Sequence, residues 1–486
     1  MQRRMTRRRF LGAMGMGAAF VTLSESTAIA KQAVGSRRAR KPNIVFILAD
    51  DLGWKDVGFM GSRYYETPHI DRLAREGIVF TQAYTNGPNC APTRASLLSG
   101  QYSPRHGVYT VGSSERGESK HRKLIPTKNK TTLDSDIVTI AEALKPAGYV
   151  SASMGKWHLG NDPELGPVGQ GFDVNIGGFE AGHPRSYFSP YRNPKLTDGP
   201  KREYLTDRLT DEALKFIEDH HDQPFFLYLP HYAVHTPLQA KKAMIEKYKK
   251  KEPSNGQGNP TYAAMVESLD QGVGRILEKL DELKLTRDTV VVFTSDNGGV
   301  KGITSMAPLR GGKGMLYEGG IRVPLVVRWP REAYDISTCD EPVISIDFYP
   351  TLLEVAGVDK SEEHVLDGKS IVAILEGRPQ PIPRALYWHF PAYLQGKAEG
   401  AHDTLFRTRP GGAIRRFEWK LIEYFEDGRL ELYNLSEDIG ETRNVAFDHP
   451  DEASGLRRML HKWRQTLQAP VPDQANPDYD PTAGQI

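Results

Sequence analysis

The 486-residue sequence predicts an α/β fold, a large and mostly parallel β-sheet sandwiched by helices, followed by a smaller C-terminal antiparallel sheet plus helix. Three observations predict it. Amphipathic helical patterns lead repeatedly through a turn into a short apolar strand, which is typical of parallel sheets covered on both faces. Polar clusters follow the strands of this region. A proline-rich segment, 376–385, then precedes a final part in which short strands follow one another directly.

The elements of the large sheet begin with the predicted strand NIVFILAD, residues 43–50. The helix predicted at 67–77 has Pro68 near its start and Gly77 past its end, where these residues are favoured. A second strand is expected in 78–84. The helix–turn–strand pattern then recurs in three later segments, 136–160, 211–237 and 267–299.

The C-terminal part has a different pattern. Residues 411–435 read as short strands joined by turns, and a closing helix is expected in 452–467. We therefore predict a large domain over 42–378, which contains all the polar strand ends, an α+β subdomain over 379–468 and an extended tail over 469–486.

The N-terminus, MTRRRFLGAMGMGAAF, resembles a twin-arginine export signal, with a small-residue cleavage site at Ala28-Ile29-Ala30. The alternative is a basic tail followed by a membrane anchor. The run 11–23 is short and glycine-rich for a span, so we expect residues 1–30 to be removed and the mature chain to have no membrane span. This predicts a periplasmic or secreted protein.

Charge and cysteine content narrow the function further. Residues 1–30 contain five arginines and one glutamate, so their removal turns the formal charge of +2 slightly negative and gives no reason to expect nucleic acid. The lysine-rich stretch 241–251 is interpreted as a solvated helix face, although it would also suit a polyanion. Cys90 and Cys339 are the two cysteines, so at most one disulfide is possible.

Two acidic pairs at predicted strand ends indicate a metal site. Asp50 and Asp51 follow one strand, and Asp296 and Asn297 follow another. Their oxygen ligands suit Ca²⁺ or Mg²⁺. The first pair taken alone would equally suit a helix cap, and the second pair favours the metal.

Basic residues surround these pairs at the same predicted edge of the sheet. Several cations beside a divalent metal are what an enzyme needs to bind a tetrahedral oxyanion and to stabilise charge during its displacement. Phosphate and sulfate esters both fit this chemistry. The residues are Arg94, Lys156, His158, His235 and Lys313.

The stretch Cys90-Ala91-Pro92-Thr93-Arg94 distinguishes between the two esters, because it matches the pattern C-x-[SP]-x-R. With LLSGQYSPRHG after it, and with PNIVFILADDLGW, GKWHLG, PHYAVHTP, SDNGG, LRGGKGMLYEGGIRVP and ELYNLSED in order, the chain resembles the type I sulfatases. These are formylglycine-dependent, arylsulfatase-like members of the alkaline-phosphatase-like superfamily. The resemblance runs from about Pro42 to Trp463.

This resemblance implies a modified residue and one calcium ion. Cys90 would be converted to formylglycine (3-oxoalanine) by a formylglycine-generating enzyme. It would then share one Ca²⁺ with Asp50, Asp51, Asp296 and Asn297. The implied sulfate pocket consists of Arg94, Lys156, His158, His235 and Lys313, with His106 supporting residue 90.

The resemblance also implies a mechanism. One hydroxyl of the aldehyde hydrate attacks sulfur, and the second then expels sulfate by C–O cleavage, which divides the reaction into two easier steps. Ca²⁺ and Arg94 orient the hydrate, and the two lysines hold sulfate oxygens. His235 protonates the departing alcohol and His158 takes the second hydroxyl's proton, although the reverse assignment stays open. A helix starting near Thr93 would direct its N-terminal dipole at residue 90.

Aromatic and basic residues in two later segments suggest sugar recognition. His183, Arg185 and His389 are the candidate substrate contacts, and packing explains each of them equally well when taken singly. The expected substrate is a sulfated carbohydrate, such as a sulfated galactose or galactosamine, with an aryl sulfate as a further option. The rival functions are a phosphodiesterase or phosphonate hydrolase of the same superfamily and an inactive sulfated-glycan-binding protein.

Overall fold

The structure is a computed structural model that describes residues 41–161, 163–330, 337–378, 384–396, 398–401 and 403–483. The predicted export signal, 1–30, lies outside the described residues, and so does segment 379–383 of the proline-rich break. The signal and the domain boundary therefore stay predictions. Among the described helices, none combines the length and the apolar character needed to cross a bilayer.

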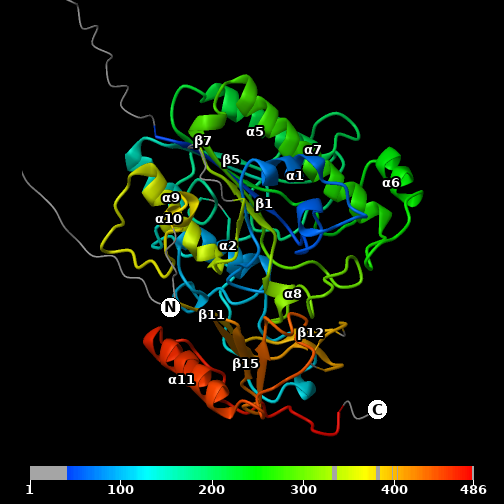
Figure 1. Cartoon of the computed structure of the whole chain (residues 1–486), viewed down its shortest axis with the longest axis vertical. Helices are drawn as coiled ribbons and strands as arrows, with labels where there is room; N and C mark the ends of the chain where they lie inside the picture. Colours follow the sequence, from blue (N-terminus) through cyan, green and yellow to red (C-terminus); the bar gives the residue numbers. More distant parts are fainter. Residues whose placement is uncertain are drawn as a thin grey trace, which may run out of the picture. The chain divides into compact units, whose positions relative to one another are not determined.

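The central sheet has eight strands in the order β5-β4-β6-β1-β7-β8-β2-β9 (Figure 1). Its strands from β5 to β7 run parallel, whereas β8 is antiparallel to both of its neighbours. The predicted large, mostly parallel sheet is confirmed. The strands are β1 (Asn43–Ala49), β2 (Ile78–Phe80), β4 (Val150–Met154), β5 (Val174–Ile176), β6 (Phe225–Pro230), β7 (Thr289–Ser295), β8 (Leu325–Arg328) and β9 (Thr338–Cys339).

Helices cover both faces of this sheet. Alternate side chains of β1 point to opposite faces, and on each face they are buried against helices. Val45 and Ile47 join an apolar cluster with α1, α5 and α7, and Ile44 and Phe46 join another with α2, α4 and α9. Figure 1 shows α1, α5 and α7 grouped together, apart from α2, α9 and α10. These helices are α1 (Pro68–Arg75), α2 (Cys90–Ser99), α4 (Ile140–Leu144), α5 (Leu205–Asp219), α7 (Pro260–Glu282), α9 (Phe348–Ala356) and α10 (Val372–Leu375).

The predicted C-terminal sheet and helix are also present. Four antiparallel strands follow the order β11-β14-β15-β16. Ile414 and Leu421 pack against Leu456 of α11 on one face, whereas Trp388 and Tyr84 belong to an apolar cluster on the other face. The elements are β11 (Ala385–Phe390), β14 (Gly411–Arg416), β15 (Trp419–Tyr424), β16 (Leu430–Asn434) and α11 (Pro450–Thr466).

Shorter elements connect these layers. β3 (Ala83–Tyr84) pairs with β10 (Val343–Ile344), and β12 (Leu394–Gln395) pairs with β13 (Phe406–Thr408). The remaining α-helices are α3 (Ser103–His106), α6 (Lys242–Lys249) and α8 (Glu318–Ile321). The 3₁₀ turns are Gly58–Met60, Ser119–His121, Lys145–Ala147, Thr286–Asp288 and Ser345–Asp347.

The described part of the tail, 469–483, contains no helix or strand, and it lies against the loop that follows α3. Ala475 forms an isolated antiparallel bridge with Leu124. Asn476 donates its side-chain amide to the carbonyls of Ser119 and Arg122, each at 2.8 Å. The tail therefore holds this loop in place by hydrogen bonds to the loop's backbone carbonyls.

Candidate active site

The polar residues predicted at strand ends do meet at one edge of the central sheet, beyond the carboxyl ends of β1, β4, β6 and β7. Asp51 and His158 have left-handed backbones, with φ of 63° and 65°. Gly155, just before Lys156, has φ 130°, and a Cβ there would lie 2.0 Å from the carbonyl oxygen of Pro230. Glycine is therefore needed where β4 and β6 approach the site.

Cys90 is the first residue of α2, with Asn89 as its N-cap. The helix expected near Thr93 thus begins three residues earlier. The Cys90 Sγ lies 3.4 Å from Asp50 Oδ1 and 3.9 Å from Asp51 Oδ1. Residue 90 therefore stands at the positive end of a helix and directly against two carboxylates.

The carboxylates and the amide of the two acidic pairs lie together and are buried. Asn297 Nδ2 donates to Asp51 Oδ1 at 2.8 Å, and the Asp51 backbone N–H donates to Asp296 Oδ1 at 3.2 Å. Asn297 Oδ1 has no hydrogen-bond partner among the described residues. Burial and the charge of Asp50 raise the pKa of Asp296.

These features suit a cation with oxygen ligands. Ligand atoms of Asp50, Asp51, Cys90 and His235 all lie within 4.8 Å of one another, which makes this a possible metal site. The orphaned Asn297 oxygen and the crowded carboxylates fit a hard divalent ion, which prefers such donors. His235 was not among the predicted ligands.

Each carboxylate also has a cationic partner. Lys156 Nζ lies 2.6 Å from Asp50 Oδ2, and Lys313 Nζ lies 2.7 Å from Asp51 Oδ1. Arg94 donates Nε and Nη2 to Asp296 Oδ2 at 3.0 and 2.8 Å. Burial alone would raise the pKa of Asp50, but Lys156 and the other nearby cations outweigh it and hold that pKa far below its usual range. The charges are thus compensated within the site.

Three histidines line the same pocket. Burial, assisted by Lys156, lowers the pKa of His158 well below its ordinary value, so this ring is neutral and its Nδ1 has no partner among the described residues. His235 has its Nδ1 2.8 Å from the carbonyl oxygen of Thr236, and its Nε2 lies 3.5 Å from Asp51 Oδ2. The His183 ring stacks on His235 with centroids 6.1 Å apart. The imidazoles of His158, His183 and His235 therefore line the same pocket as Cys90.

The structure places three of the predicted residues elsewhere. His106 lies under α2, where its Nε2 is 3.0 Å from Ser96 Oγ and its Nδ1 accepts from the Val108 backbone at 3.1 Å. Arg185 is exposed and does not line the pocket. His389 is 4% exposed, with Nε2 2.9 Å from the carbonyl oxygen of Pro470. His389 thus occupies a packing position between the C-terminal sheet and the tail.

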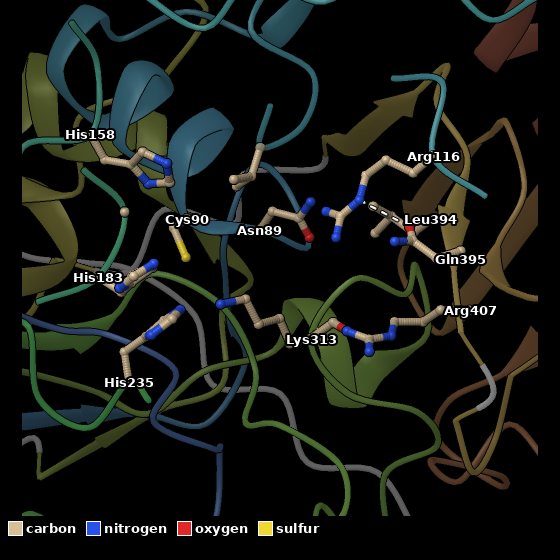
Figure 2. A pocket seen from close by; sticks show the side chains of 12 residues that line it. Asn89, Cys90, Arg116, His158, His183, His235, Lys313, Leu394, Gln395 and Arg407 are labelled. Atoms are coloured by element: carbon tan, nitrogen blue, oxygen red, sulfur yellow. Dashed lines mark hydrogen bonds between the residues drawn. The ribbon is translucent and has the colours of Figure 1, made fainter. Parts of the chain in front are cut away.

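The pocket encloses about 300 Å³ and contains residues that the sequence reasoning missed. Figure 2 shows the histidines on one side of Cys90 and two arginines, Arg116 and Arg407, on the other. Neither arginine follows a strand of the central sheet, so the strand-end pattern gives no signal for them. The remaining lining residues are Asn89, Val111, Gly182, Lys313, Leu394 and Gln395.

An α/β sheet that brings a helix-start cysteine, a possible metal site and several basic side chains to one edge is typical of hydrolases of tetrahedral oxyanion esters. The sulfatase family model matches residues 42–358, and the model described as N-sulphoglucosamine sulphohydrolase, C-terminal, matches 312–469. The chain belongs to the sulfatase family and is a sulfuric ester hydrolase.

Relatives cover almost the whole chain. A protein named sulfatase from Formosa agariphila is 36% identical, over 89% of this chain and 90% of that relative. The human N-acetylgalactosamine-6-sulfatase is 30% identical, over 89% of this chain and 87% of its own length. The crystal structure of Ps i-CgsB in complex with k-i-k-neocarrahexaose has a TM-score of 0.74 and 30% identity, covering 90% of this chain and 95% of that one.

Proposed function

We propose that this enzyme removes sulfate from a sulfated carbohydrate, with residue 90 acting as formylglycine beside one Ca²⁺. The observation that carries the proposal is the position of Cys90, at the start of α2 and 3.4 Å from Asp50, on the floor of a pocket lined by Lys313, His158 and His235. A nucleophile at this point has a cation site behind it and proton-transferring groups beside it.

The residues present fit both groups. Asp50, Asp51, Asp296 and Asn297 would hold Ca²⁺ together with residue 90, and the unpartnered Asn297 oxygen supports this ligand set. When present, Ca²⁺ supplies a charge that stabilises developing negative oxygen, and formylglycine supplies a hydrated aldehyde as the attacking group. Conversion of Cys90 would require a formylglycine-generating enzyme, and Pro92 and Arg94 supply its sequence motif.

The basic side chains would bind and orient the sulfate group. Lys313 lines the pocket beside Cys90, so its ammonium group, 2.7 Å from Asp51 Oδ1, would contact an entering sulfate. The Lys156 ammonium group is fully buried 2.6 Å from Asp50 Oδ2, and its charge would act on the same sulfate from beneath the pocket lining. Arg94 is fully buried and fixed at both ends, to Asp296 and to the Lys156 carbonyl oxygen at 2.7 Å. It therefore orients α2, and with it residue 90, against β7.

The histidines would move the protons. His158 is neutral and unpartnered at Nδ1, which suits a group that accepts a proton from residue 90. Burial lowers the pKa of His235, although the charges of Asp50 and Asp51 partly oppose this shift. Its Nδ1 lies at the Thr236 carbonyl and its Nε2 lies 3.5 Å from Asp51 Oδ2, so Nε2 is the nitrogen that would pass a proton to the leaving alcohol. His183, stacked on His235, would contact the sugar at the pocket mouth.

A carbohydrate is the favoured substrate because of the relatives. One is named N-acetylgalactosamine-6-sulfatase, and another was crystallised with k-i-k-neocarrahexaose. The twin-arginine-like N-terminus supports export, so we propose that the enzyme meets such a substrate in the periplasm or outside the cell.

The test is sulfate release from a panel of sulfated mono- and oligosaccharides and an aryl sulfate, on protein whose residue-90 aldehyde is verified by mass spectrometry. The matching aryl phosphate tests the phosphodiesterase alternative. We expect sulfate release that falls about 10³-fold or more in Cys90→Ala. The control Cys339→Ala changes the other cysteine, in β9, and should keep activity. Preferential phosphate turnover that survives loss of Cys90 would overturn the proposal.

A further inference from the structure

The pocket has two chemically different walls on either side of Cys90 and Lys313 (Figure 2). One wall consists of His158, His183 and His235. The other consists of Arg116 and Arg407, with Gln395 beside them. The histidine wall serves the reacting sulfate, so the arginine wall needs a separate explanation.

The two arginines lack the acidic partners that the other pocket cations have. Arg116 Nε donates to the Gln395 side-chain oxygen at 3.0 Å, and Arg407 Nη1 donates to the Lys313 carbonyl oxygen at 3.4 Å. Both acceptors are uncharged. Among the described residues no carboxylate lies within 4.0 Å of either guanidinium, whereas Arg94, Lys156 and Lys313 each contact one. The positive charge of this wall is therefore available to a ligand.

Arg407 is a partly buried guanidinium group close to a second positive charge, that of Arg116. Its Nε is buried and has no hydrogen-bond partner among the described residues. Burial and the neighbouring charge of Arg116 lower the pKa of Arg407. Two like charges held close together in a half-buried pocket repel each other, and an anion between them relieves that repulsion.

The Arg116 side of the wall is held by the protein and is not a loose surface chain. Arg122 is 8% exposed, and its Nη1 donates to the carbonyls of Glu115 at 3.0 Å and Gly117 at 2.6 Å, on either side of Arg116. Asn476 of the tail fixes the Arg122 carbonyl in turn. The backbone on either side of Arg116 is thus fixed by hydrogen bonds from Arg122, which is itself bonded to the tail.

The Arg407 side is equally defined. Arg407 lies in β13, which pairs with β12 and its Gln395. Gly314 has φ 87°, and a Cβ there would lie 2.9 Å from Arg407 Cδ. A glycine at this position lets the loop of Lys313 pass close to the arginine, which brings the second wall next to the sulfate pocket.

We propose that Arg116 and Arg407 form a second anion subsite that binds another sulfate or a carboxylate on the same carbohydrate. Guanidinium groups bind both anions in bidentate fashion, and a planar fork with unused donors fits either. This inference rests on the proposed function and narrows it, because the preferred substrate becomes a polyanionic oligosaccharide and not a sugar with a single sulfate.

The experiment compares three disaccharides that share one backbone: a monosulfated form, a disulfated form, and a form with one sulfate and one uronate carboxylate. The Arg116→Gln/Arg407→Gln double variant should lose about 30- to 100-fold in kcat/KM on a dianionic substrate, mainly through KM. Its kcat/KM on the monosulfated form should change by less than about threefold. The Arg116→Lys/Arg407→Lys double variant should recover part of the lost kcat/KM, because lysine restores the positive charge but not the bidentate guanidinium geometry. The two dianionic substrates show whether sulfate or carboxylate is preferred.

Binding to Cys90→Ala by calorimetry separates this inference from the proposed function. If no substrate releases sulfate from the wild type, the proposed function fails, and calorimetry still decides whether dianionic sugars bind more tightly through the arginines. Equal losses on all three substrates, or no loss on any, would overturn the inference. Arg443→Gln, at a side chain 76% exposed, is the matched control, and thermal unfolding verifies that each variant is folded.

Discussion

His389 provides a test that separates a packing role from a substrate role. The sequence suggests a sugar contact, whereas the structure buries the ring among Tyr109, Phe425 and Trp463. Its Nε2 lies 2.9 Å from the Pro470 carbonyl oxygen. We propose the His389→Gln variant, because a glutamine keeps a donor for that carbonyl and removes the titrating ring.

The size of the expected change in unfolding free energy follows from the pKa of His389. Burial lowers the pKa of His389 from 6.5 to about 3. The folded ring stays neutral while the unfolded chain takes up a proton below pH 6.5, so its stabilising effect is complete above that pH and is lost as the pH falls toward 3. Each pH unit below 6.5 costs the wild type about 1.4 kcal/mol. The loss at pH 5 is therefore about 2 kcal/mol relative to the variant.

The assay is urea unfolding of both proteins between pH 8 and pH 5, with His221→Gln, at an exposed position, as the control. We expect the stability advantage of the wild type over His389→Gln to shrink by about 2 kcal/mol over this range. We also expect kcat/KM at pH 7.5 to stay within about twofold of the wild type. A stability difference that is constant with pH, or a kcat/KM more than about tenfold lower in a stable variant, would refute the reasoning.

Two further predictions concern the metal site and the tail. Compared with protein at a free Ca²⁺ concentration of 100–1,000 times Kd, protein treated with EDTA should have a free energy of unfolding about 3–4 kcal/mol lower, since Asp50, Asp51 and Asp296 lose a shared cation. Ca²⁺ should restore stability and sulfate release better than Mg²⁺, and an unfolding curve that EDTA leaves unchanged would contradict the site. The Asn476→Ala variant removes two side-chain hydrogen bonds to the loop carbonyls. Hydrogen exchange of the Ile125 amide, which donates to the Gln474 carbonyl, should become about five- to tenfold faster when measured by mass spectrometry. Unchanged exchange would mean that the tail does not hold the loop.

The sequence predicted the parts of the site that depend on local pattern. Asp50, Lys156, His235 and Asp296 each follow an apolar strand, and parallel strands end at one edge of their sheet. Alternation of helix and strand also sufficed to predict two covered faces. The antiparallel direction of β8 could not be read in this way, because a buried strand has the same apolar composition in either direction.

Residues outside that pattern were misplaced or missed for a physical reason. The stretch around His389 is rich in aromatic residues, which also pack in a largely buried strand, and His389 lies in such a strand. Arg116 and Arg407 are almost three hundred positions apart and meet only because β12 and β13 fold back beside the loop after α3. No local periodicity reports such a contact.

The chemistry and the proposed specificity of this enzyme come from different parts of the chain, and they meet at one short piece of backbone. Carboxylates and cations of the proposed reaction centre come from the ends of the central strands, from α2 and from Lys313, where each charge compensates another. The arginine wall comes from a loop and from β13. It touches the reaction centre where Arg407 donates to the Lys313 carbonyl, one residue before Gly314 donates its backbone N–H to Pro88 at 2.8 Å. Substitutions in the arginine wall should therefore alter KM and substrate choice. Among these substitutions, only those that also displace Lys313 should alter kcat.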